Sequence, residues 1–101
     1  MFQQISINEA INVANKINGI IVDLRSRDDY EISHLQGAIS IPFEEMDEKA
    51  FFYYKNKTII LYCEYGTRSM RMAWFLEQKG YQVINTIGGF HQYNKERSDR
   101  R

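Results

Sequence analysis

Residues 58–69 read Thr-Ile-Ile-Leu-Tyr-Cys-Glu-Tyr-Gly-Thr-Arg-Ser and contain the clearest indication of fold class in the chain. The first half is a run of β-branched and aromatic side chains, which is the strongest strand signal in the sequence. The second half is a short loop with Gly66, followed by a helical pattern over about residues 68–79 that Gly80 closes. A strand, a tight loop and a helix are therefore predicted in direct succession.

Strands and helices alternate on both sides of this stretch. A capping box at residues 6–9 predicts a first helix, which continues through Ile17 and ends at Gly19. Further predicted elements are strands at 20–24, 37–41 and 81–87, a brief helix after Ser26, helical turns within 44–54, and an amphipathic segment after Gly88 and Gly89. Such alternation builds right-handed crossovers, so we expect an α/β domain with a mainly parallel sheet and helices on both faces.

The composition restricts the domain count and the partners. The chain has 101 residues, which suits one domain, and we expect that domain over residues 1–95 with a frayed polar tail at 96–101. Thirteen basic residues balance thirteen acidic ones, so no basic field is available to attract nucleic acid or an anionic membrane. The longest apolar runs are far shorter than the ~20 residues of a membrane helix. One cysteine and no signal-like start favour a soluble protein in the reducing cytoplasm.

The single cysteine, Cys63, falls at the carboxyl end of a predicted strand, where parallel α/β sheets bind ligands. Gly66 lets the loop turn backbone N–H groups inward, and the following helix start adds positive potential. These features favour a thiolate and make Cys63 a candidate nucleophile. A lone cysteine is also commonly an ordinary core residue. The combination of strand end, glycine loop, arginine and helix start favours the reactive interpretation.

The loop after Cys63 has the composition of a small anion site. Arg68 offers a fork of donors, Ser69 adds a hydroxyl, and Arg71 lies one turn further along in support. The candidate binding loop comprises Glu64, Tyr65, Gly66, Thr67, Arg68 and Ser69. Glu64 opposes thiolate formation and repels an anionic donor unless its carboxylate points to solvent. The Tyr65 ring either lines the pocket or faces water.

Other polar residues are expected to support the fold. Asp23 and Arg25 are two residues apart at the end of the strand 20–24, so they share a face and can tie this strand end to neighbouring backbone. His34 is expected to hold the following turn rather than to act as a general base, and His91 to lie at the surface. The sequence contains no cluster with metal-ligand spacing, so no metal is expected.

Two apolar groups complete the expectations. Met70, Met72, Trp74 and Phe75 make the helix after the loop apolar around much of its circumference, which predicts its burial between the sheet and neighbouring segments. The four aromatic residues at 51–54 cannot all face one core, so at least one is expected to be exposed, where it could form a partner surface. Core packing is the default expectation for this cluster.

The chain contains two separated motifs. The first motif is Ile21-Val22-Asp23-Leu24-Arg25, then Tyr30, His34-Leu35-Gln36-Gly37-Ala38 and Ile41-Pro42; the second is residues 63–69 with the later Gly80 and Gly88-Gly89. In order and spacing, both motifs resemble the rhodanese (thiosulfate sulfurtransferase) family. Together they span about residues 20–93. The resemblance implies a rhodanese-like parallel sheet of about five strands and no cofactor. It also implies a persulfide on Cys63, stabilised by the amides of residues 64–69.

The resemblance further implies a ping-pong transfer of sulfane sulfur. A small-molecule donor such as thiosulfate or a persulfide would load Cys63, and a thiol, cyanide or a sulfur-relay protein would accept the sulfur. Four residues separate Cys63 from Arg68, whereas related phosphatases and arsenate reductases have one more, so sulfur transfer is favoured over phosphate chemistry. The alternative hypothesis is a non-catalytic binding or redox-sensing module of the same fold.

Overall fold

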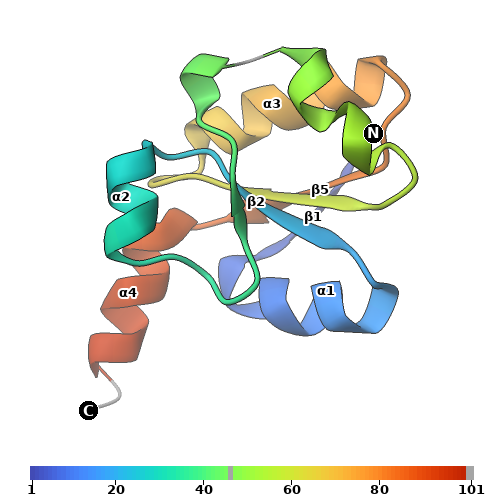
Figure 1. Ribbon diagram of the computed structural model, residues 1–101. Coiled ribbons are helices and arrows are strands. Elements are labelled where there is room, and N and C mark those ends of the chain that lie inside the picture. The colour runs from blue at the N-terminus through green and yellow to red at the C-terminus, as the bar shows by residue number, and fades with distance from the viewer. Residues whose placement is uncertain (46, 100–101) are drawn as a thin grey trace.

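The computed structural model describes residues 1–45 and 47–99, in which five parallel strands lie between helical layers (Figure 1). The strands are β1 (Gln3–Ser6), β2 (Ile20–Asp23), β3 (Ile39–Ser40), β4 (Ile59–Tyr62) and β5 (Val83–Ile87). They are ordered β1-β5-β4-β2-β3, and every neighbouring pair is parallel. The predicted α/β class, with a mainly parallel sheet of about five strands and helices on both faces, is confirmed.

Strand β4 lies at the centre of the sheet and leads into the candidate site. It pairs with β2 on one side and β5 on the other, so that Leu61 is in register with Val22 and Asn85. All four residues of β4 are buried. A central parallel strand is covered on both faces, which explains why its sequence is continuously apolar rather than alternating.

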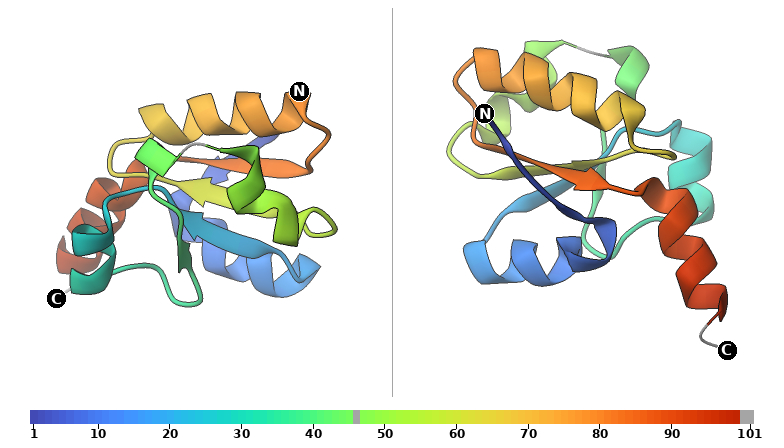
Figure 2. Two further views of the ribbon diagram at one scale, coloured as in Figure 1. Left: turned by 45° about the horizontal axis from the view of Figure 1, so that its top comes forward. Right: turned by 180° about the vertical axis from the view of Figure 1, so that it is seen from behind.

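Helices cover both faces of the sheet (Figure 2). They are α1 (Ala10–Ile17), α2 (Arg27–Ile32), α3 (Thr67–Gln78) and α4 (Gly89–Asp99), with the 3₁₀ helices η1 (Ile7–Glu9), η2 (Phe43–Glu45) and η3 (Glu48–Tyr54). α3 and η3 lie on one face, and α1 and α4 on the other. Within the described ranges, every helix is too short or too polar to cross a bilayer.

Alternate strand residues contribute to two separate cores. Leu61 packs with Met72 of α3 and Phe51 of η3 on one face. Ile60 packs with Ala14 of α1 on the other. Both cores meet β4, so the strand that ends at the cysteine is held from both sides.

The amino-terminal segment differs from the prediction. β1 was not predicted, because only Ile5 of its four residues is buried and an edge strand of this length carries little pattern. Ser6 accepts a hydrogen bond from the Asn8 backbone N–H at 3.2 Å, so it caps η1, and α1 begins only at Ala10.

The structure also specifies the helix type of the 44–54 segment and the extent of the carboxyl-terminal helix. The helical turns within 44–54 are 3₁₀ rather than α-helical. α4 continues to Asp99, so residues 96–99 of the expected frayed tail are helical. Residues 100–101 lie outside the described part of the chain.

The expectation that α3 is buried between the sheet and neighbouring segments holds for one side of the helix and is wrong for the other. Met72 is fully buried, but Trp74 is 53% exposed and Met70 is also exposed. Trp74 packs edge-on against Phe2 at the surface, with ring centroids 6.4 Å apart. α3 covers one face of the sheet as an outer layer, so the side chains on its far side have no core to enter. Within the aromatic run 51–54, the expected exposure is confirmed at Phe52 and Tyr53.

Candidate active site

Cys63 follows β4 directly, and the loop that leads to α3 folds around its sulfur. The backbone N–H groups of Gly66 and Ser69 donate to Cys63 Sγ at 3.0 and 3.3 Å. Gly66 is the N-cap of α3 and has φ +101°, a conformation that side chains rarely adopt. The start of α3 therefore directs two donors and the positive end of the helix dipole at one sulfur atom.

The start of α4 holds this loop from the other side. The Phe90 N–H donates to the Cys63 carbonyl at 2.8 Å, and the His91 N–H donates to the Glu64 carbonyl at 3.0 Å. Gly89 has φ +72°, and a Cβ at this position would overlap the Glu64 carbonyl group. Gly89 thus permits the close approach of α4 to the cysteine loop.

Asp23 and Arg25 form a buried network at the end of β2. The Asp23 carboxylate accepts from the Arg25 backbone N–H, from its guanidinium and from the Tyr62 hydroxyl at 2.8, 2.8 and 2.6 Å. Arg25 also donates to the Ser33 carbonyl at 2.6 Å, and its guanidinium lies 4.0 Å from the Phe90 ring centroid. As expected, the pair ties the strand end to neighbouring backbone.

The protonation states of this network follow from burial and from the Asp23 charge. Burial raises the pKa of the Tyr62 phenol, and the Asp23 carboxylate that accepts its proton raises it further. Burial alone would lower the pKa of Arg25, but the hydrogen bond and the charge of Asp23 outweigh it, so that pKa is raised. Tyr62 is therefore neutral and Arg25 charged.

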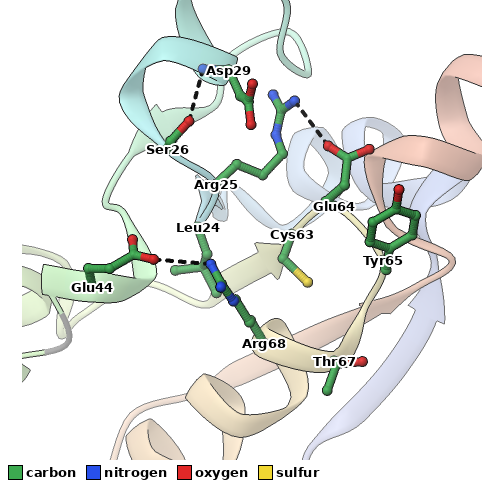
Figure 3. Close-up of a pocket in the computed structure, with 10 residues that line it drawn as sticks. All are labelled: Leu24, Arg25, Ser26, Asp29, Glu44, Cys63, Glu64, Tyr65, Thr67 and Arg68. Atoms are coloured by element: carbon green, nitrogen blue, oxygen red, sulfur yellow. Dashed lines mark hydrogen bonds and ion pairs between the residues drawn. The ribbon is translucent and has the colours of Figure 1, made fainter.

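A pocket of about 360 Å³ opens at Cys63 between α2, η2 and the cysteine loop (Figure 3). Its wall carries the charged side chains Arg25, Asp29, Glu44, Glu64 and Arg68. Both arginines face carboxylates. Nη1 of Arg68 lies 3.1 Å from Oε1 of Glu44, and Nη1 of Arg25 lies 3.7 Å from Oε1 of Glu64.

The predicted loop residues reach the site in different ways. Thr67 and Arg68 line the pocket, as does Tyr65, whose exposed ring stands 5.2 Å from that of His91. Glu64 points toward Arg25 at the pocket wall rather than away into solvent.

Two predicted contributions need correction. The Ser69 hydroxyl donates to the Gly66 carbonyl at 3.1 Å, so this residue serves the sulfur through its backbone N–H and its hydroxyl caps the helix turn. Arg71 does not line the Cys63 pocket. It lines a neighbouring hollow beside Trp74 and Ile87, because it lies roughly 4.5 Å further along α3 than Arg68 and about 60° round the helix axis from it.

The two histidines lie outside the pocket. His34 Nδ1 is 2.6 Å from the Tyr30 carbonyl oxygen, and its ring stacks on the Tyr30 ring at 3.8 Å, so it packs against α2. His91 is exposed. In residues 1–45 and 47–99, no three side chains among His, Cys, Asp and Glu come together as a metal site.

Asp29 and Glu44 line the pocket and were not singled out from the sequence. Asp29 lies in α2 and Glu44 in η2, and both elements are distant in sequence from Cys63. Glu44 entered the prediction only as the first residue of the helical turns within 44–54. No local motif marks either residue. Their placement depends on how β2 and β3 position the segments that follow them.

Comparison with known proteins places this geometry in a family. The model of the rhodanese-like domain matches residues 6–96. The chain is 32% identical to the thiosulfate sulfurtransferase GlpE of Coxiella burnetii, over 92% of this chain and 88% of that protein. A rhodanese-like domain protein from Staphylococcus aureus has a TM-score of 0.78 at 25% identity, covering 91% of both chains. The BH2092 protein of Bacillus halodurans has a TM-score of 0.78 at 29% identity, covering 95% of this chain and 73% of that one. The chain therefore belongs to the rhodanese-like domain family.

Proposed function

We propose that this protein is a sulfurtransferase that carries sulfane sulfur as a persulfide on Cys63. The observation that carries the proposal is the pair of N–H groups, from Gly66 and Ser69, that point at Sγ from 3.0 and 3.3 Å. Donors fixed in this way stabilise negative charge on sulfur without reorganising during the reaction. The name of its Coxiella burnetii relative, a thiosulfate sulfurtransferase, supports the same reaction class.

The reaction consists of two displacements at sulfur. In the first, the Cys63 thiolate attacks the outer sulfur of a donor such as thiosulfate or a persulfide. The donor S–S bond breaks, and the remainder leaves with the electron pair. In the second, a thiolate, cyanide or a sulfur-relay protein attacks the outer sulfur of the persulfide. The Sγ–S bond then breaks and the Cys63 thiolate is regenerated, so the cycle requires no external oxidant or reductant.

The length of the loop supports sulfur as the transferred group. Four residues lie between Cys63 and Arg68, and the amides of Gly66 within this span and of Ser69 just after it both point at Sγ. A single sulfane sulfur needs less room above the thiolate than a tetrahedral phosphate with its oxygens. The dependence on one reduced thiol also suits a reducing compartment, so we extend the proposal to a cytoplasmic setting.

Intact-mass spectrometry tests the proposal directly. The reduced protein is incubated with thiosulfate or with a low-molecular-weight persulfide, next to a Cys63→Ser variant whose fold is checked by circular dichroism. We expect the mass of one added sulfur atom on the wild-type chain only, and its removal by cyanide or a thiol.

The opposite outcome has a clear meaning. If no donor adds sulfur to the folded protein and Cys63 alkylates only slowly at neutral pH, the proposal is wrong. The same fold would then serve as a binding or redox-sensing module rather than as an enzyme.

A further inference from the structure

We propose that the Cys63 pocket selects uncharged and positively charged sulfur partners over anionic ones, and that Glu64 and Glu44 set this preference. The inference rests on the sulfur transfer proposed above and specifies its substrate class. It is carried by the arrangement of charged side chains around Cys63.

Carboxylates outnumber cations at the pocket wall. Asp29, Glu44 and Glu64 line the pocket together with only two guanidinium groups. A fourth carboxylate, Asp23, lies directly behind the wall and is fully buried. The charged side chains of the pocket wall therefore sum to a negative charge, although the chain as a whole has no net charge.

The guanidinium of Arg25 is already hydrogen-bonded to groups of the protein. Its side chain is only 6% exposed, and it donates to the Asp23 carboxylate at 2.8 Å and to the Ser33 carbonyl at 2.6 Å. The remaining terminal nitrogen faces Glu64 at 3.7 Å, and Glu64 is 38% exposed. An anion that enters the pocket thus meets the Glu64 carboxylate beside the remaining donor of Arg25.

Arg68 is paired in the same manner on the opposite side of Cys63, as Figure 3 shows. Its Nη1 donates to Glu44 at 3.1 Å, and its guanidinium lies 5.4 Å from the Phe43 ring centroid. To bind an oxyanion, Arg68 has to leave Glu44 or share its charge with it. Each cation of the pocket therefore has a carboxylate that competes with an anionic substrate for it.

The competition for the two arginines is important because the groups that react at Cys63 are themselves negatively charged. A persulfide or an attacking thiolate already brings one negative charge to the sulfur. A second negative group, as in thiosulfate or a carboxylated thiol, is repelled by Glu64 and Glu44 at short range in a partly enclosed site. An ammonium group on the partner is attracted by the same carboxylates, and an uncharged partner is affected by neither.

A single-turnover discharge experiment measures this preference. Cys63 is first loaded with sulfur, and loading is verified by intact mass. The persulfide is then discharged at low ionic strength by cysteamine, 2-mercaptoethanol or 3-mercaptopropionate, which differ in charge away from the thiol. For each thiol, the rate in a variant is divided by the rate in the wild type, so that the intrinsic nucleophilicity of the thiol cancels.

The variants are Glu64→Gln, Glu44→Gln and the double variant. Glu77→Gln is the matched control, because it removes a carboxylate from the far end of α3, ten residues after Thr67, or roughly 15 Å along the helix axis. Glu44 and Glu64 are at least partly exposed, so their amide forms are expected to fold.

We expect each pocket variant to accelerate discharge by 3-mercaptopropionate roughly three- to tenfold and to slow discharge by cysteamine by a similar factor. The ratio for 2-mercaptoethanol should stay within about twofold, and salt near 1 M should compress the differences because it shortens the screening length. Glu77→Gln should leave all three ratios near one.

Two results would contradict the inference, and they are distinguishable. If the sulfur loads but all three thiols change by the same factor, the carboxylates tune the persulfide and do not select partners, so the inference is wrong while the proposed function stands. If no sulfur loads onto Cys63, the proposed function itself fails and this inference fails with it.

Discussion

The Tyr62 hydroxyl donates a 2.6 Å hydrogen bond to Oδ2 of Asp23 and so joins the carboxyl ends of β4 and β2 beneath the pocket. The same hydroxyl accepts a hydrogen bond from the Leu35 backbone N–H at 3.1 Å. One buried oxygen therefore holds two strands and the segment after α2. Cys63 follows one of these strand ends directly and Arg25 lies two residues beyond the other, so the bond fixes both sides of the site.

Replacing Tyr62 by Phe tests this linkage. At neutral pH the variant should lose about 1–3 kcal/mol of unfolding free energy, because the Leu35 N–H and the Asp23 carboxylate each lose a buried partner. Denaturant unfolding followed by circular dichroism measures the loss. An unchanged midpoint would contradict the stabilising role of this hydroxyl.

The pH dependence of stability separates Tyr62 from the other tyrosines. Burial and then the Asp23 charge raise its pKa in the folded state, so above about pH 10 the unfolded chain releases this proton while the folded chain keeps it. The unfolding free energy of the wild type should therefore fall as pH rises past about 10, by up to about 1.4 kcal/mol per pH unit from this one group. The stabilisation is fully present below that pH.

The control for this prediction is the slope in the Phe variant. Between about pH 9.5 and 11 the variant should lose stability less steeply than the wild type, since the other groups that titrate in this range, Tyr81 among them, are common to both proteins. Equal slopes would mean that Tyr62 ionises in the folded protein as readily as in the unfolded chain.

Gly89→Ala should disturb the cysteine loop without unfolding the domain. A Cβ at this position would overlap the Glu64 carbonyl, which α4 holds through the His91 N–H. We expect a loss of about 1–3 kcal/mol in stability and a reduction in the rate of sulfur loading of at least about tenfold, because the loop amides move away from the sulfur.

Gly80→Ala provides a matched control for backbone strain. Gly80 also has a positive φ, +90°, but a Cβ there meets nothing within 4 Å, and it lies at the end of α3 remote from the loop. This variant should lose a similar amount of stability from its strained backbone and retain normal loading. Equal loading rates in the two variants would disprove the proposed role of Gly89.

The central features of the fold could be predicted because they depend on local sequence. The apolar run that ends at Cys63, the Ser26 helix cap, which accepts from the Asp29 N–H, and the loop glycine each act on their immediate neighbours. These short-range signals were sufficient for the sheet class and for the placement of the cysteine at a strand end.

The features that were not predicted depend on tertiary packing, which leaves no local pattern in the sequence. β1 is recognisable only by its pairing with β5. The exposure of the outer side of α3 becomes apparent only when the packing of the whole domain is known. Glu44 reaches Arg68 across 24 positions of sequence. For the same reason, the motif predicted that Arg68 lies near Cys63 but gave no indication that its guanidinium is paired with a carboxylate.

Replacing side chains by alanine on the two sides of α3 should lower the stability of the domain by different amounts. Met72→Ala removes a fully buried side chain and should cost about 2–4 kcal/mol. Trp74→Ala removes a larger but half-exposed side chain that packs edge-on against Phe2, and should cost less than about 1 kcal/mol. Trp74 is the only tryptophan, so unfolding is followed by circular dichroism rather than fluorescence. A larger loss at Trp74 than at Met72 would contradict the placement of α3.

Arg68 and Arg71 provide the sharpest test of the site, because they lie three residues apart on one helix and line different hollows. Arg68→Ala removes the guanidinium from the pocket and leaves Glu44 unpaired beside Cys63, and both changes disfavour negative charge at the sulfur. Loading from thiosulfate should therefore slow by at least about tenfold, while stability changes by less than about 0.5 kcal/mol, because the Arg68 side chain is 56% exposed.

Arg71→Ala should change neither quantity, since its side chain lines the neighbouring hollow and not the Cys63 pocket. The rate of sulfur loading from thiosulfate is measured for both variants in quenched time courses, and thermal unfolding checks that both variants are folded. A normal loading rate in Arg68→Ala would remove this residue from the site. An equal loss in both variants would point instead to the general positive charge at the start of α3, in which case the pairing of Arg68 with Glu44 has no part in positioning the substrate.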